Sequence, residues 1–222
     1  MRKTIAALVA GGVAIGVLAG CGSADTGNTT DNTNSSAQPL LAQLGQDYEA
    51  DFDPLVSPKQ ALELSDLIVR GTVAEVHDGI TTAYPDAQRT QRGQGQYVTL
   101  QVAVTEVVSG PAAAVTDGQV YVQVAKSPST PTSAIAGANT KADAVLILED
   151  ISTWKPSPDA TVNRPEKVPA AAPLFFAYPD GLWLQGGADA AMAGNAEREH
   201  LAPAWGAPTT LNDLVGALRS VR

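Results

Sequence analysis

Short runs of alternating apolar residues, most of them β-branched, limit the fold of this chain more than any other sequence feature. One run places Val98, Leu100, Val102 and Val104 on one face, and a second run at 120–124 repeats the alternation. A period of two is that of a strand with one buried face. The segment 144–148 is apolar without interruption, which is typical of a strand buried on both faces. The pattern therefore predicts a mainly β chain.

Glycine and proline interrupt the remaining strand-like segments. Residues 67–76 are rich in β-branched side chains. Gly71 within them, together with a change of phase near Glu75, predicts a bulge in this strand. The polar segment 77–96 predicts a long loop. Pro179-Asp180-Gly181 separates the apolar segments 174–178 and 182–184, so we expect a hairpin turn there.

A helix is expected near each end of the folded part. Ser57 and Gln60 fit a capping box with Pro58 at the first helical position, and Thr210 and Asp213 fit a second capping box. The second helix carries an apolar stripe at 211, 214, 215 and 218. These elements predict a mainly β (α+β) fold. We expect a small five- to six-stranded OB-like barrel or sandwich with a short N-terminal helix and a C-terminal helix.

The segment 65–73, Ser-Asp-Leu-Ile-Val-Arg-Gly-Thr-Val, resembles the first strand of netrin-like OB barrels. In that family a long loop follows, and then a second strand that ends in a lysine-glycine turn. Here the second strand is Tyr97 to Val108, followed by Ser109-Gly110-Pro111. The resemblance covers about half of the mature chain and implies a fold. It does not carry over the protease inhibition known in the family, because this chain lacks the disulfides of those inhibitors.

The amino terminus has the order of a secretory signal. Arg2 and Lys3 precede a segment, 4–20, that contains no charged residue, and this segment ends in Leu18-Ala19-Gly20-Cys21. The ending resembles the lipobox of bacterial lipoproteins. The resemblance implies cleavage between Gly20 and Cys21, a diacylglyceryl thioether on Cys21 and an acylated new amino terminus. The alternative is an uncleaved membrane helix. The composition, poor in lysine and rich in Ala, Gly, Val, Pro and Arg, suggests a high-GC, actinobacterial-type source.

Cys21 is the single cysteine of the chain, so no intramolecular disulfide can form and the mature domain must depend on an apolar core. The segment 22–39 is polar and has no aromatic residue, which predicts a flexible tether. Leu40, Leu41 and Leu44 could dock on the domain. We therefore expect a signal peptide at 1–20, a lipid-anchored tether at 21–44 and a single mainly β domain at 45–222.

Net charge limits the classes of partner. The chain has 14 basic and 23 acidic residues. Without Arg2 and Lys3 the mature form has 12 basic residues against 23 acidic ones, a net charge of −11. Such a chain is a poor candidate for nucleic acid, which requires basic patches.

No catalytic or metal-binding motif is evident. His77 and His200 are the only histidines, and neither has a second histidine at ligand spacing. No Gly-x-Ser-x-Gly elbow is present. We expect both histidines to be solvated loop residues, and we expect neither a metal nor a cofactor.

Carboxylates and tryptophans are the remaining candidates for a site. Glu149 and Asp150 follow the most apolar strand, and Asp51 and Asp53 flank Phe52. Two carboxylates about 5–10 Å apart could hydrolyse a glycosidic bond, although strand-end charges that face water are the more economical explanation.

Trp183 and Trp205 could offer a stacking surface to a sugar or peptide, although packing in the core is the more common role of such residues. The four candidate ligand-binding residues are thus Trp183, Trp205, Glu149 and Asp150.

Two functions remain open at this point. The leading hypothesis is a noncatalytic protein of the cell envelope, held by lipid on the extracytoplasmic face of the cell membrane, that binds a protein or a wall polymer. The alternative is a carbohydrate-binding or carbohydrate-acting envelope protein. A structural spacer without a ligand is a third possibility.

Overall fold

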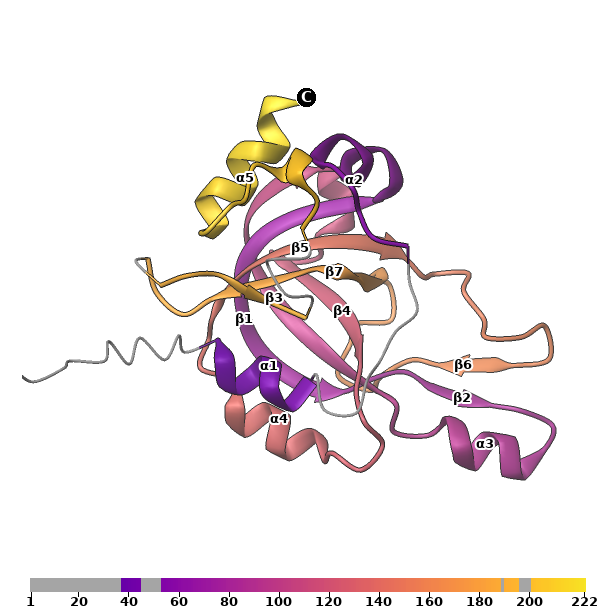
Figure 1. The fold of residues 1–222 in the computed structure, drawn as a ribbon. Helices are drawn as coiled ribbons and strands as arrows, with labels where there is room; N and C mark the ends of the chain where they lie inside the picture. The colour runs from indigo at the N-terminus through magenta and orange to yellow at the C-terminus, as the bar shows by residue number, and fades with distance from the viewer. Residues whose placement is uncertain (1–36, 45–52, 189, 196–200) are drawn as a thin grey trace, which may run out of the picture. The chain divides into compact units, whose positions relative to one another are not determined.

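Five strands form a closed barrel in the computed structural model, which describes residues 37–44, 53–188, 190–195 and 201–222 (Figure 1). The strands are β1 (Leu67–Asp78), β3 (Tyr97–Ser109), β4 (Gln119–Ala125), β5 (Asp143–Asp150) and β7 (Leu174–Gln185). Their order is β4-β3-β1-β5-β7, and a parallel pairing of β4 with β7 closes the barrel. The short β8 (Ala193–Gly194) adds a sixth strand beside β7. The mainly β, five- to six-stranded barrel predicted from the sequence is therefore confirmed.

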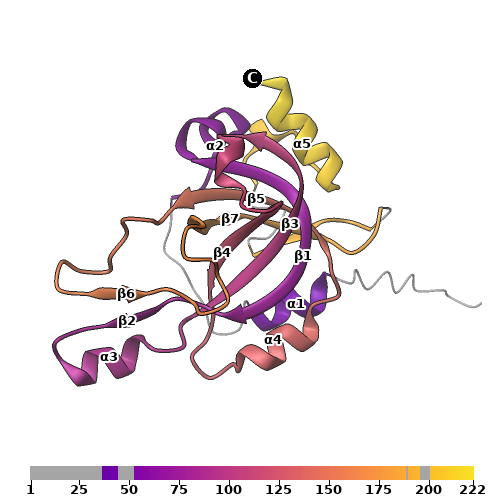
Figure 2. The same cartoon turned by 180° about the vertical axis from the view of Figure 1, so that it is seen from behind.

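Helices cover the two ends of the barrel (Figures 1 and 2). At one end α2 (Pro58–Leu64) contacts α5 (Leu211–Ser220), and at the other end α1 (Gln38–Leu44) contacts α4 (Thr132–Ala138). A two-stranded sheet of β2 (Thr81–Ala83) and β6 (Thr161–Asn163), together with α3 (Ala87–Gly93), projects from one side. Single 3-10 turns lie at Ala112–Ala114 and Pro203–Trp205. The helices expected near the two ends of the folded part are present as α2 and α5.

The predicted capping box is complete at α5 but only half formed at α2, where the Gln60 side chain accepts a hydrogen bond from the Val56 N–H and not from that of Ser57. The Ser57 hydroxyl accepts a hydrogen bond from the Gln60 backbone N–H at 3.1 Å. Thr210 and Asp213 form a complete capping box at the start of α5. A capping box satisfies backbone N–H groups that have no partner inside the first helical turn, so it sets the residue at which the helix begins.

The apolar residues form three clusters: one inside the barrel, one outside it under α5, and a third around Ile80 and Leu174. Strand β5 contributes to the first two: Ala144, Leu146 and Leu148 face the interior, while Val145 and Ile147 pack under α5. This two-sided burial confirms the interpretation of segment 144–148. The interior cluster also includes Leu40, Leu41 and Leu44 of α1, so the leucines that could dock on the domain do so, and the folded part includes α1.

Strand β1 is irregular where the sequence predicts a bulge. Its register against β3 shifts between Arg70 and Gly71 and again between Val73 and Glu75. A Cβ atom on Gly71 would collide with the backbone oxygen of Ala103 on β3. Glycine at this position lets the two strands approach closely enough for the barrel to curve.

Two sequence interpretations are wrong. Pro179-Asp180-Gly181 does not turn a hairpin: β7 runs through it as one strand, antiparallel to β5. The register shifts between the pairs Leu146–Leu182 and Leu148–Ala177, so the tripeptide lies in a bulge of β7. The polar segment 77–96 is also not a plain loop, because it contains β2 and α3.

Within the described part of the chain, no helix has the length and apolar character needed to cross a membrane. The candidate signal segment, the lipobox and most of the predicted tether lie outside the described residues.

Candidate functional site

The parallel seam that closes the barrel leaves a cavity. Strands β4 and β7 pair through three residues each, Tyr121 to Gln123 with Leu174 to Phe176. Beyond this point no pairing joins the two strands, and a cavity of about 240 Å³ lies between them. We call it the seam cavity. Its apolar lining comes from both strands: Val124 and Ala125 of β4, and Ala177, Pro179 and Leu182 of β7.

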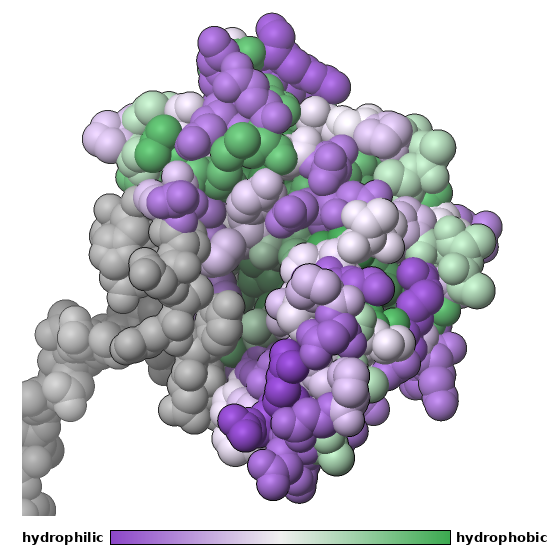
Figure 3. Space-filling model, turned by 90° about the vertical axis from the view of Figure 1, so that its right-hand side faces the viewer, coloured by the Kyte–Doolittle hydropathy of each residue, from purple (hydrophilic) through white to green (hydrophobic). Residues whose placement is uncertain are grey.

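Aromatic rings form the wall of the seam cavity nearest to the projecting β2–β6 sheet. Tyr97 stacks on Phe176 with ring centroids 5.5 Å apart, and both residues line the cavity. Trp154 meets the Phe176 ring edge-on at 4.9 Å and fixes it from the side. The space-filling view shows a hollow with a hydrophobic interior among hydrophilic residues (Figure 3). A partly apolar pocket with a few polar groups is the usual form of a small-ligand site.

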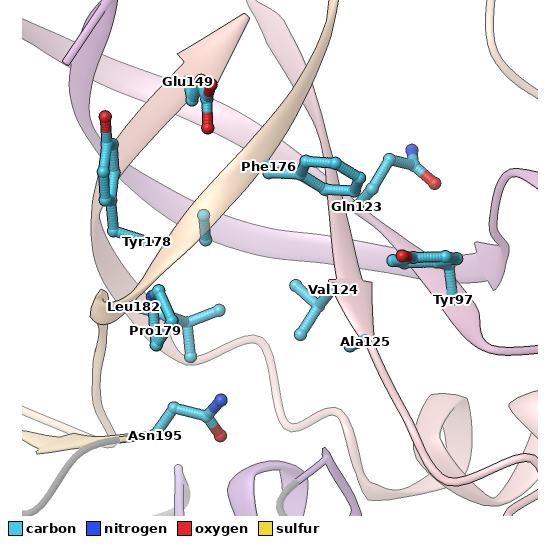
Figure 4. A pocket seen from close by; sticks show the side chains of 11 residues that line it. Tyr97, Gln123, Val124, Ala125, Glu149, Phe176, Tyr178, Pro179, Leu182 and Asn195 are labelled. Carbon is cyan, nitrogen blue, oxygen red and sulfur yellow. The ribbon is translucent and has the colours of Figure 1, made fainter. Parts of the chain in front are cut away.

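Polar groups lie at opposite sides of the seam cavity. Figure 4 shows Glu149 and the Tyr178 ring on one side and Asn195 on the other, with Pro179 and Leu182 between them. Glu149 and Asn195 are exposed, so both can reach a ligand. Glu149 can accept hydrogen bonds, and the Asn195 amide can both donate and accept them.

The Tyr178 hydroxyl already has a hydrogen-bond partner within the protein. It donates a hydrogen bond to the carbonyl of Leu64 at 3.0 Å. Burial raises the pKa of Tyr178, and the nearby carboxylates of Glu149, Asp66 and Asp180 raise it further. Tyr178 therefore stays neutral and serves as a cavity wall.

Gln123 supports the cavity from beneath. Its side chain is 1% exposed, and its amide oxygen accepts a hydrogen bond from the Ile80 backbone N–H at 2.9 Å. Its amide nitrogen donates to the Thr99 hydroxyl at 3.0 Å. These bonds tie the floor of the cavity on β4 to β3 and to the start of the projecting segment.

Asp180 is a buried carboxyl that directly follows the cavity-lining residue Pro179. It is 5% exposed, its Oδ2 accepts a hydrogen bond from the Leu55 N–H at 2.6 Å, and its Oδ1 has no partner within the described residues. Burial raises the pKa of Asp180, although the Leu55 hydrogen bond acts in the opposite direction. Asp180 does not line the cavity, and it anchors the segment that precedes α2.

The two candidate tryptophans lie in the outer apolar cluster and not at a surface. Trp183 is 0% exposed and its indole N–H donates to the Asp180 carbonyl at 2.7 Å. Trp205 is 2% exposed and donates to the Leu55 carbonyl at 2.7 Å. Neither ring offers a face to a ligand in this structure, and core packing accounts for both. Trp183 packs in the apolar cluster under α5 and does not line the seam cavity.

The candidate carboxylates do not form a pair. Glu149 and Asp150 are neighbours on β5, and adjacent side chains of a strand point to opposite faces. Glu149 lines the seam cavity. Asp150 instead accepts a hydrogen bond from the Ser152 backbone N–H at 2.7 Å. Of the other carboxylate candidates, Asp53 is exposed at the edge of the described chain, and Asp51 lies outside the described residues.

The expectation that His77 is a solvated loop residue is wrong. His77 belongs to β1 and is 7% exposed, with its Nε2 3.1 Å from the Gln101 side-chain oxygen and 3.2 Å from a Glu75 oxygen. His200, Gly20 and Cys21 lie outside the described residues. Among the residues that the structure describes, no group of three metal-binding side chains occurs.

Sequence reasoning missed the aromatic residues of the site. Tyr97 and Trp154 lie at the ends of polar segments, where no period links them to each other. The spacing of Phe176 and Tyr178 could have indicated a shared strand face. Their meeting with Tyr97 depends on the β4–β7 pairing, which has no local signal.

No family model matches the chain, and no curated protein or solved structure matches it either.

Proposed function

We propose that this chain is a noncatalytic, lipid-anchored protein of the bacterial cell envelope that binds a saccharide of a wall polymer in the seam cavity. The single observation that supports binding at this place is the seam cavity itself, with apolar and aromatic walls and with Glu149 and Asn195 at its rim. Aromatic faces accept the C–H faces of sugar rings, while carboxylate and amide groups hydrogen-bond to ring hydroxyls. Small OB barrels are also known to bind oligosaccharides.

Binding is favoured over hydrolysis by the distribution of carboxylates. Glu149 is the one carboxylate among the described residues that line the seam cavity. Glycoside hydrolysis ordinarily requires two carboxyl groups across the scissile bond. A lone carboxylate at a rim can orient a sugar but cannot provide both the acid and the nucleophile or base.

The anchoring part of the proposal depends on the lipobox-like ending at Cys21. Two acyl chains hold a protein stably at a membrane, whereas one chain holds it marginally. The test compares intact mass and membrane fractionation of the wild type and Cys21→Ala. If the variant stays membrane-bound and its mass differs only by the substitution, lipidation at Cys21 is refuted.

The binding part is tested by calorimetric titration of the full-length protein in detergent with soluble wall glycan fragments. Glu149→Gln should weaken binding about 10-fold, because a hydrogen bond to a charged group contributes about 1.5–3 kcal/mol and the neutral amide oxygen of glutamine still accepts one that contributes about 0.5–1.5 kcal/mol. The matched control is Glu63→Gln, an exposed glutamate on α2 whose side chain faces solvent. Absence of binding by the wild type, or equal affinities of both variants and the wild type, would refute a saccharide site at the seam.

A further inference from the structure

A second cavity adjoins the seam cavity and has a different chemical character. It has a volume of about 210 Å³ and lies between α3 and the segment that follows β5. Tyr97 lines both cavities, and Trp154, which meets the Tyr97 ring edge-on at 6.4 Å, lines the second. The two cavities therefore share an aromatic wall, and an elongated ligand could occupy both.

Two guanidinium groups line the second cavity. Arg89 and Arg92 are three residues apart on α3, a spacing that places both on one face of the helix. This cluster stands out in a chain whose net charge is −9. A cavity with two arginines favours an anionic group, because the guanidinium fork matches the geometry of carboxylate and phosphate oxygens.

Among the described residues, Arg89 has an ion-pair partner and Arg92 has none. Arg89 forms an ion pair with Asp159 at 2.9 Å, and its guanidinium lies over the Tyr84 ring at 4.2 Å from the centroid. These contacts hold Arg89 in one orientation. Across the described chain, no carboxylate lies within ion-pair distance of Arg92, so its charge remains available to a ligand.

We infer that the second cavity is a subsite for an acidic group of the bound saccharide, a carboxylate or a phosphate, held by Arg92 beside the fixed Arg89. This inference rests on the proposed function, because it places the acidic group next to the sugar that occupies the seam cavity. It also gives the ligand a direction. The acidic group lies toward α3, because the Glu149 carboxylate would repel it at the other end. The uncharged end of the ligand lies toward Glu149.

The negative net charge of the chain argues against a polyanionic ligand such as nucleic acid. One unpaired arginine matches one acidic group, whereas a nucleic acid strand carries a phosphate at every nucleotide and would face an acidic chain. The inferred ligand therefore alternates neutral and acidic sugars or carries isolated acidic substituents.

The test uses two tetrasaccharides of equal length: chitotetraose, which is neutral, and the dimer of N-acetylglucosaminyl-N-acetylmuramic acid, which differs by its lactyl carboxylates. Titration of the full-length protein in detergent at low salt should give about 10-fold tighter binding of the acidic probe. Arg92→Gln should abolish this preference by lowering the affinity for the acidic probe about 10-fold more than the affinity for chitotetraose. The control Lys59→Gln removes an exposed cation on α2 and should keep the preference. Inorganic phosphate should compete with the acidic probe and not with chitotetraose.

The outcomes separate the inference from the proposed function. Equal affinities for both probes, or a preference that survives Arg92→Gln, would overturn the acidic subsite and leave saccharide binding intact. An equal loss of affinity for both probes in Arg92→Gln would also overturn it, because the arginine would then not distinguish the acidic probe from the neutral one. Failure of the wild type to bind either probe would refute the proposed function together with the inference.

Discussion

Two glutamines on β4 should respond in opposite ways to the same substitution. Gln123 and Gln119 are four residues apart on this strand. The Gln123 amide oxygen accepts the Ile80 N–H at 2.9 Å, and the residue is 1% exposed. The Gln119 amide oxygen is buried without a partner among the described residues. Gln123→Leu therefore removes a satisfied group, while Gln119→Leu removes an unsatisfied one.

The loss of stability expected for Gln123→Leu follows from the hydrogen-bonding groups that lose their partner. The Ile80 N–H loses its acceptor inside the protein, and an unsatisfied buried group costs about 1–3 kcal/mol. The Thr99 hydroxyl loses the amide but keeps the carbonyl of Asp78 as an acceptor at 3.1 Å, so it adds little. We expect a loss of about 2 kcal/mol in the free energy of unfolding. For a domain of this size that corresponds to a decrease of about 4–8 °C in Tm.

The assay is thermal unfolding of the full-length protein followed by circular dichroism in the strand region. Gln119→Leu should leave Tm unchanged or raise it, because the substitution removes a buried polar atom that has no partner. If both variants lost the same amount of stability, the hydrogen bonds of Gln123 would not be the cause, and the account of the cavity floor would be wrong.

Three further predictions concern stability. The raised pKa of Asp180 means that the folded state binds its proton more tightly than the unfolded state. Stability should therefore fall as the pH rises above about 4 and through the raised pKa. Asp180→Asn should flatten this dependence in Tm measured from pH 3.5 to 8, and parallel curves would contradict it. Gly71→Ala should destabilise the fold by about 1–3 kcal/mol in urea unfolding, because the added Cβ atom would collide with the facing strand. The control Gly216→Ala, in open space on α5, should stabilise by about 0.5–1 kcal/mol. Thr210→Ala should cost about 1 kcal/mol in the same assay through loss of the helix cap, and an unchanged midpoint would refute the role of the cap.

Local patterns predicted the elements that depend on local contacts. The alternation at 98–104 corresponds to β3, whose Val98, Leu100 and Val102 face the barrel interior. The capping box at Thr210 and Asp213 begins α5 where expected. A cap depends on residues three positions apart, and strand alternation depends on the pleat, so both can be read along the chain.

Long-range pairing overrode local signals in several places. Pro179-Asp180-Gly181 has the composition of a turn, yet pairing with β5 on both sides of it makes the segment a bulge in β7. His77 looks like a loop residue, yet β1 extends through it because β3 continues to pair with it. In both cases many ladder hydrogen bonds outweigh the preference of a few residues.

The sequence by itself determined that this chain is mainly β, that it has no intramolecular disulfide and that Ser57 and Thr210 cap two of its helices, since composition and spacing decide these properties. Only the tertiary structure decided where a ligand could bind. The seam cavity exists because β4 and β7, about 50 residues apart in sequence, pair in parallel for three residues and then separate. That closure brings Tyr97, Phe176 and Glu149 to one cavity and buries Trp183 away from it. No short-range pattern encodes a contact between segments so far apart, because their meeting depends on the barrel as a whole.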